Sequence, residues 1–159
     1  MQPSMRTETR VELKGVHLCC QGCVDGIDAA LEGVKGVRSQ CEMKNGIVAL
    51  TASDDAAAQR ALNALSAAGY YGETGNKRLA MKAVRNVPQG KVKRLKVSGI
   101  HNCSEPCCDA IKGAIATVHG VTGDTAKPRA STFEVMGDFD AGALVKALNA
   151  AGFSAQATQ

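Results

Sequence analysis

The chain has 159 residues, which is enough for one ordinary domain or for two very small ones. Hydrophobic residues make up 45% of it and charged residues 21%, so its composition is that of a globular protein and excludes an intrinsically disordered one. Aromatic residues amount to only 3%, and there is no Trp, so the core must be aliphatic and rich in Ala. No apolar run approaches the roughly 20 residues that span a bilayer, and we expect no membrane insertion.

The net charge of +4 is unevenly distributed along the chain. Residues 1–76 and 97–159 each have a net charge of −2, whereas the 20 residues between them carry eight Lys or Arg side chains and no acidic one. This basic segment contains Pro88 and Gly90, and such a pattern is typical of a connector between two domains. It lacks aromatic residues and nucleic-acid motifs, so we expect no nucleic-acid binding. Docking of the basic segment to an acidic partner is the alternative.

An internal repeat indicates the architecture. Residues 15–37 align with residues 99–121 at an offset of 84 without a gap, and ten of these 23 positions are identical. The later halves match at an offset of 83, where residues 64–70 correspond to residues 147–153. We therefore predict a first domain, a basic linker and a second domain, over residues 8–76, 77–91 and 92–159.

Each copy shows the order strand, helix, strand, strand, helix, strand. In the first copy, alternating apolar residues predict a strand at 10–14, and an apolar stripe from Val24 to Val34 predicts a helix. Strands are predicted at 37–43 and 47–52, then an Ala-rich helix that starts at Ser53 or Asp54 and ends at Gly69, then a strand at 70–74. In the second copy, the first strand contains Leu95 and Val97. Helices follow at about 107–118 and 139–151, and strands near 124–127 and 131–136.

Six of the seven Cys lie in two equivalent loops or at the first residue beyond them. Both loops follow the pattern Gly-(Val/Ile)-His-x-Cys-x-x-x-Cys. Thiolates two to four residues apart can converge on one soft metal ion, and a Cys that opens a helix is favoured as a thiolate. The predicted metal ligands are Cys19, Cys20, Cys23, Cys103, Cys107, His17 and His101.

Other Cys and His residues have structural interpretations. Cys108 replaces Val24 on the apolar stripe, so it is expected in the core, although its place beside Cys107 suggests a role at the loop. Cys41 alternates with apolar residues along a strand, which points to a buried structural Cys. The two loop His residues are equally well explained as partners of backbone carbonyls.

The repeated unit resembles the heavy-metal-associated (HMA) domain of copper chaperones and metal-transporting ATPases. The resemblance lies in Cys20-Gln21-Gly22-Cys23, in the apolar Ile27 four residues after Cys23, and in Ile111 four residues after Cys107. The family's first Cys is Ser104 in the second copy, its Met is missing, and both loops are two residues longer. The resemblance implies an α+β fold of two tandem ferredoxin-like βαββαβ domains, with antiparallel sheets and helices on one face.

The leading hypothesis is a soft heavy-metal ion binding protein that acts as a metal chaperone, store or sensor and is not an enzyme. Each module is expected to hold Cu(I), with Zn(II) as the rival ion, because Cys19, Cys20, Cys23 and His17 form a Cys₃His set. The resemblance implies a metal-transporting ATPase or another metal-handling protein as partner. The alternative is a thiol–disulfide redox protein that uses Cys19/Cys23 and Cys103/Cys107.

The number and state of the thiols bear on the compartment. Seven is an odd number of Cys and does not fit a fully paired disulfide framework, and residues 1–10 contain no signal-peptide pattern. We therefore expect a cytoplasmic protein with reduced thiols. A periplasmic protein whose signal peptide has been removed is the alternative.

Overall fold

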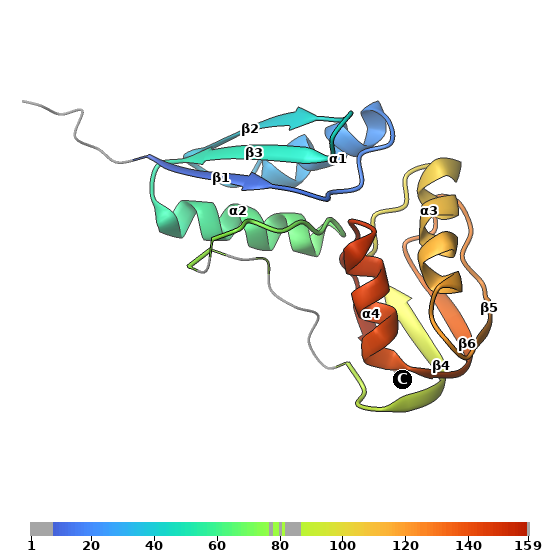
Figure 1. Ribbon diagram of the computed structural model, residues 1–159. Helices are drawn as coiled ribbons and strands as arrows, with labels where there is room; N and C mark the ends of the chain where they lie inside the picture. The colour runs from blue at the N-terminus through green and yellow to red at the C-terminus, as the bar shows by residue number, and fades with distance from the viewer. Residues whose placement is uncertain (1–7, 77, 80, 82–86, 159) are drawn as a thin grey trace, which may run out of the picture.

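The computed structural model describes residues 8–76, 78–79, 81 and 87–158. These residues form two antiparallel sheets, one in each half of the chain, and each sheet is accompanied by two helices that contact one another (Figure 1). The protein is therefore an α+β protein made of two similar units, as the repeat predicts.

The first unit contains a three-stranded sheet in the order β1-β3-β2. Its elements are β1 (Thr9–Leu13), α1 (Gln21–Leu31), β2 (Val37–Glu42), β3 (Ile47–Ala52) and α2 (Asp55–Ala67). Asp54 caps α2, because its carboxylate accepts a hydrogen bond from the backbone N of Ala57 at 2.8 Å. The second helix of this unit thus begins where the sequence predicts.

The second unit contains a four-stranded sheet in the order β5-β6-β4-β7. Its elements are β4 (Lys91–Ser98), α3 (Glu105–Ala116), β5 (Val121–Asp124), β6 (Phe133–Asp140), α4 (Ala141–Ala150) and β7 (Gln156–Thr158). The first and third strands of the unit, β4 and β6, are central, and in the first unit β1 and β3 are likewise paired. This is the ferredoxin-like strand order expected for a βαββαβ unit.

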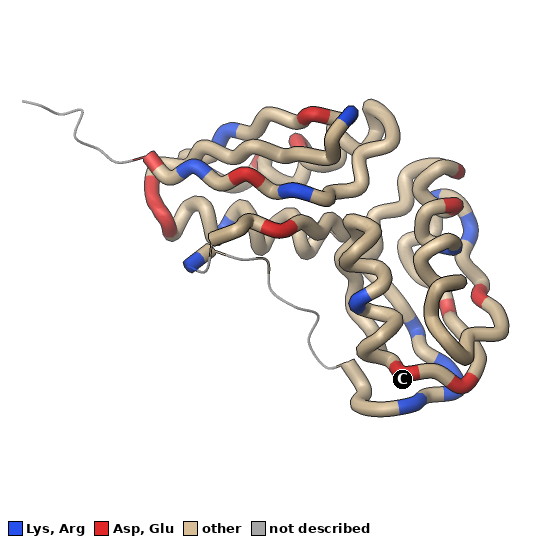
Figure 2. The backbone as a smooth tube through the Cα atoms, in the orientation of Figure 1, with Lys and Arg blue, Asp and Glu red and all other residues tan. Residues whose placement is uncertain are grey.

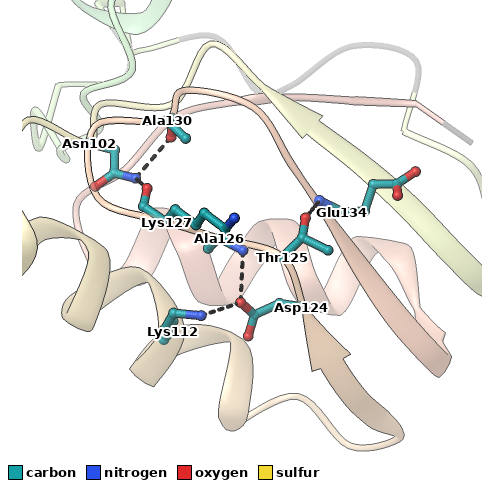
Figure 3. Close-up of polar contacts among 8 residues, drawn as sticks. All are labelled: Asn102, Lys112, Asp124, Thr125, Ala126, Lys127, Ala130 and Glu134. Atoms are coloured by element: carbon teal, nitrogen blue, oxygen red, sulfur yellow. Dashed lines mark hydrogen bonds and ion pairs between the residues drawn. The ribbon is translucent and has the colours of Figure 1, made fainter.

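Two predicted strands differ from the structure. Residues 70–74 form only isolated bridges, between Lys14 and Glu73 and between Tyr70 and Phe153, because Tyr70 turns towards the other unit. In the second unit, the strand predicted at 124–127 lies earlier, as β5. It ends at Asp124, whose carboxylate accepts a hydrogen bond from the backbone N of Ala126 at 3.0 Å and so bends the chain into a loop (Figure 3).

Each unit has its own core of aliphatic and small side chains. The largest fully buried side chains are Leu13, Ile27, Leu50, Leu62, Leu65 and Tyr70 in the first unit, and Leu95, Ile111, Ile115, Phe139, Leu144 and Phe153 in the second. Cys108 is 1% exposed and lies in the second core, which confirms its packing interpretation. Cys41 is half-buried against the first core, so it is less buried than predicted. Leu79 and Met81 also pack into the first core.

Equivalent turns after α2 and α4 join the two units. Gly69 and Gly152 follow these helices with φ angles of +95° and +94°, a region that favours Gly. The turns exchange two backbone hydrogen bonds, from Tyr71 N to Gly152 O at 3.0 Å and from Ser154 N to Gly69 O at 2.8 Å. Because these two bonds are related by the repeat offset of 83, the units meet around an approximate two-fold axis.

Basic side chains gather where the chain enters the second unit. Lys91, Lys93, Arg94 and Lys96 are exposed on β4, and Figure 2 shows the charges along the chain. Lys77, Lys82 and Arg85 of the predicted linker lie outside the described residues. Among the described helices, none is long and apolar enough to cross a membrane.

Candidate metal centre

Both Cys loops end at the N-terminus of a helix. Cys20 and Ser104 are the N-cap residues of α1 and α3, so Cys23 and Cys107 occupy the third position of these helices. Both Cys23 and Cys107 are 0% exposed. The positive end of each helix dipole therefore faces a buried thiol, which favours its thiolate form.

The two loops face one another across the boundary between the units, and their sulfur atoms form one cluster. The Sγ atom of Cys23 lies 3.7 Å from that of Cys107. Cys19 contacts both of them, at 3.6 Å from Cys23 and 3.4 Å from Cys107. Cys103 also contacts both, at 3.7 Å and 3.4 Å. The sulfur atoms thus form two triangles that share the Cys23–Cys107 edge.

One imidazole accompanies each triangle. A ring nitrogen of His17 lies with the sulfur atoms of Cys19, Cys23 and Cys107 in a group whose members are all within 4.8 Å of one another. His101 forms the corresponding group with Cys23, Cys103 and Cys107. Its Nε2 is 3.2 Å from the Sγ of Cys23. Each group therefore takes three residues from one loop and the helix-opening Cys from the other.

Aromatic residues of the two joining turns hold the imidazoles. The ring of Tyr70 stacks on His101 with centroids 4.2 Å apart, and Phe153 packs on His17 at 4.5 Å. The Tyr70 hydroxyl donates a hydrogen bond to the backbone O of Cys23 at 2.7 Å. Tyr70 and Phe153 are equivalent in the repeat, so each unit orients the His of the other.

Cys20 breaks the symmetry of the cluster. Its Sγ lies 3.7 Å from that of Cys103 and 3.9 Å from the hydroxyl of Ser104, which is its counterpart in the second unit. The backbone N–H of Cys23 lowers the pKa of Cys20 to about 7. Burial raises the pKa of Cys19 and of Cys103 to about 11.

The two helix-opening thiols titrate as a pair. The hydrogen bond between the sulfur atoms of Cys23 and Cys107 lowers the pKa of Cys107 far below its ordinary value. The same hydrogen bond raises the pKa of Cys23, which keeps the shared proton. Without a cation the pair therefore favours one negative charge, and a bound cation would release the remaining proton.

The second Cys loop is anchored by Asn102. Its side-chain amide is buried and donates to the backbone O atoms of Lys127, at 2.8 Å, and Ala130, at 2.9 Å (Figure 3). Just before this segment, the carboxylate of Asp124 accepts a hydrogen bond from the side chain of Lys112 at 2.6 Å. The hydroxyl of Thr125 accepts a hydrogen bond from the backbone N of Glu134 at 2.8 Å, which joins the start of the segment to β6. The loop that carries His101 and Cys103 is thus tied to the 125–130 segment.

The residues present fit a soft metal ion. Two thiolates on one tetrahedral ion with metal–sulfur bonds of about 2.3 Å lie about 3.8 Å apart, close to the sulfur separations found here. Nε2 of His17 is buried and has no hydrogen-bond partner among the described residues. A bound cation would supply that partner.

The structure brings all seven sequence-predicted ligands to one place, but the arrangement differs from the one expected. The sequence predicts two separate modules, each with its own site, whereas the loops form one cluster across the unit boundary. Cys41 and Cys108 lie outside it, in or against the cores. Sequence reasoning missed Tyr70 and Phe153, although their equivalence in the repeat was visible.

Comparisons with known proteins add little. No protein-family model matches the chain, and no curated protein matches its sequence. Among solved structures, the chain is similar to the N-terminal soluble domains of Bacillus subtilis CopA, at 13% identity and a TM-score of 0.33, over 96% of this chain and 95% of that chain. The fold assignment therefore rests on the strands and helices of this protein itself.

Proposed function

We propose that this protein binds soft heavy-metal ions, Cu(I) in the first place, and holds them between its two units as a metal store or sensor without catalysing a reaction. The observation that supports this most is the cluster of five thiols and two imidazoles contributed by both loops. Soft thiolates select Cu(I) over hard cations. Zn(II) is the rival ion, because each group offers three thiolates and one imidazole.

The burial of the site favours a store or sensor over a simple shuttle. Cys23 and Cys107 are fully buried, and a ligand set drawn from both units cannot be handed over by exposing one loop. Release therefore requires the units to move apart or a partner to reach the more exposed thiols, Cys19 and Cys20. Such a partner would be a metal-transporting ATPase or another metal-handling protein. All seven thiols are free, which suits a reducing compartment such as the cytoplasm.

Metal stoichiometry of the reduced protein tests this function. We would offer Cu(I) and Zn(II) together under anaerobic conditions and measure the bound metals by mass spectrometry. The matched variants are Cys23→Ala/Cys107→Ala, which removes the shared edge, and Cys41→Ala, which removes a thiol outside the cluster. We expect Cu(I) to bind the wild type and Cys41→Ala equally and the double variant far less. Equal binding by thiol-blocked protein would contradict the proposal.

The second candidate function is thiol–disulfide exchange, favoured by the short sulfur contacts within each loop. Cys19 lies 3.6 Å from Cys23, and Cys103 lies 3.4 Å from Cys107. In this reaction two thiols would lose two electrons and two protons to oxidised glutathione, forming one protein disulfide and two molecules of reduced glutathione. Incubation with oxidised glutathione, followed by peptide mass spectrometry, tests it. Absence of exchange in metal-free protein would exclude this candidate.

A further inference from the structure

We propose that the cluster is a dinuclear centre in which the sulfur atoms of Cys23 and Cys107 bridge two metal ions. This inference rests on the function proposed above. His17 and Cys19 would complete the ligand set of the first ion, and His101 and Cys103 that of the second. Each ion would then have three thiolates and one imidazole.

The shared edge of the two sulfur triangles is the geometric basis. Cys19 and Cys103 each lie within 3.7 Å of both Cys23 and Cys107. The two four-residue groups have only the Cys23–Cys107 pair in common. Each of these two thiols is therefore within reach of both ion positions, whereas each remaining ligand is within reach of one.

The number of donors also argues for two ions. The two groups contain six different side chains, but a structural Zn(II) site takes four ligands. A single ion would leave two of the six donors without a metal. It would also occupy only one of two donor groups that the repeat makes equivalent. Two ions use all six donors, including a ring nitrogen of His17, whose Nε2 has no hydrogen-bond partner among the described residues.

Charge leads to the same conclusion. The four thiolates of Cys19, Cys23, Cys103 and Cys107 would carry four negative charges, two of them on fully buried side chains. One Cu(I) would offset a single charge, and two would offset two, with the N-termini of α1 and α3 contributing further. Two Zn(II) would offset all four. Once all four thiols have lost their protons, two ions leave less uncompensated buried charge than one ion does, and such charge is costly.

The bridging geometry sets the separation of the ions. If metal–sulfur bonds are about 2.3 Å and the Cys23–Cys107 separation stays at 3.7 Å, a flat diamond of two metals and two sulfurs places the metals about 2.7 Å apart. Two independent modules would show no metal–metal contact. X-ray absorption spectroscopy of the wild type loaded with Cu(I) therefore distinguishes the two arrangements without any variant.

Ligand variants provide the second test, in a Cu(I) titration of the whole reduced chain against a coloured Cu(I) chelator. We expect two Cu(I) per wild-type chain. Cys19→Ser and Cys103→Ser should each lower the affinity for one ion and leave the other ion tightly bound. The loss should be at least roughly 10- to 100-fold, which is what removal of an outer-shell partner of a metal ligand costs. Cys23→Ser should weaken both ions, although it lies in the first unit. Circular dichroism checks that each variant is folded.

Each outcome of these two experiments has a definite meaning. Two ions with a short metal–metal contact, both weakened by Cys23→Ser, support the dinuclear centre. One ion per chain, or two ions without a metal–metal contact, overturns it and leaves the proposed metal-binding function standing. No bound Cu(I) at all overturns both.

Discussion

Cys20 and Ser104 occupy equivalent positions in the two loops, yet only Cys20 adds a thiol to the cluster. Its side chain is half-buried at the edge of the cluster, and the backbone N–H of Cys23 holds its pKa near 7. At neutral pH Cys20 is therefore a thiolate, the nucleophilic form, in about half of the protein molecules. Cys107 has a lower pKa but is fully buried, so Cys20 is the most reactive of the accessible thiols in the metal-free cluster.

Alkylation of the reduced, metal-free protein by iodoacetamide tests this. At pH 7 we expect Cys20 to react first, ahead of the more exposed Cys19, whose pKa is raised to about 11. The rate at Cys20 should fall as the pH drops below 7, because its thiolate is protonated there. Peptide mass spectrometry over time measures both rates, and Cys41, with a pKa raised by burial, is the slow control. Equal rates at Cys19 and Cys20 would contradict the argument.

Asn102 is a second residue at which the two loops differ, since its counterpart is the buried Leu18. Asn102→Leu removes both hydrogen bonds to the 125–130 segment. The backbone O of Lys127 keeps its hydrogen bond from the backbone N of Ala130 at 3.1 Å, whereas the backbone O of Ala130 loses the bond from Asn102. We expect a loss of about 1–3 kcal/mol in the free energy of unfolding, measured by urea denaturation.

Lys112→Met is the matched control for this variant. It breaks the Lys112–Asp124 ion pair, in which the Lys side chain is 43% exposed, so we expect a loss of no more than about 1 kcal/mol. If the two variants lose the same amount of stability, Asn102 does not anchor the loop.

The residue types of the ligands could be predicted from the sequence. That each donor group takes ligands from both units could not. The repeat shows that His17, Cys19 and Cys23 correspond to His101, Cys103 and Cys107. Which copy's thiols meet which imidazole depends on how the units pack. That packing is set by backbone contacts at Gly69 and Gly152, which a pattern of side chains does not reveal.

The turns after α2 and α4 are the elements on which this packing depends. A Cβ atom at Gly152 would lie 2.2 Å from the backbone N of His17, and one at Gly69 would lie 2.1 Å from that of His101. Gly is therefore favoured at both positions, because φ is positive and the backbone contact leaves no room for a side chain. Each contact also fixes the backbone of a candidate ligand.

Gly152→Ala tests the role of these turns. We expect a loss of more than about 1 kcal/mol in unfolding free energy, because Ala is strained at this φ and its Cβ must displace the His17 backbone. Binding of Cu(I) should weaken as well, since His17 moves. Urea denaturation and chelator competition measure the two effects.

Gly113→Ala is the control at the same scale. Gly113 lies in α3, and a Cβ there meets nothing within 4 Å. The free energy of unfolding of this variant should therefore rise by about 0.5–1 kcal/mol, and its Cu(I) affinity should not change. A Gly152→Ala protein that behaves like Gly113→Ala would show that the turn contact has no energetic role.

At the level of elements, strong local patterns were predicted well and weak ones were not. The strand at 47–52 and the start of α2 are found where the alternation and the Asp54 cap indicate. The strand predicted at 70–74 is reduced to bridges, because Tyr70 serves the contact with the other unit instead of continuing the sheet. The local sequence of residues 70–74 does not reveal this contact with the other unit.

For the whole molecule, ligands drawn from both units imply that metal binding couples their stabilities. Both Tyr residues, Tyr70 and Tyr71, belong to the first unit, so Tyr fluorescence reports on its unfolding. We expect Cu(I) to raise the denaturation midpoint seen by this signal, because an ion that binds only the folded state stabilises it.

The decisive variant for this coupling lies in the other unit. Cys103→Ser should reduce the rise in the first unit's midpoint, although Cys103 belongs to the second, while Cys41→Ser within the first unit should leave it unchanged. If the rise is the same in Cys103→Ser as in the wild type, the units bind metal separately.

The approximate two-fold axis between the units has a further consequence, for the origin of the chain. Each donor group takes three residues from one copy and one from the other. A lone ancestral copy could therefore have formed this cluster only as a homodimer, at a concentration high enough to pair. Fusion of two copies makes the encounter intramolecular. It also lets the copies diverge, as Cys20 and Ser104, or Tyr70 and Phe153, have done. Asymmetry of this kind makes the two halves of the cluster chemically unequal.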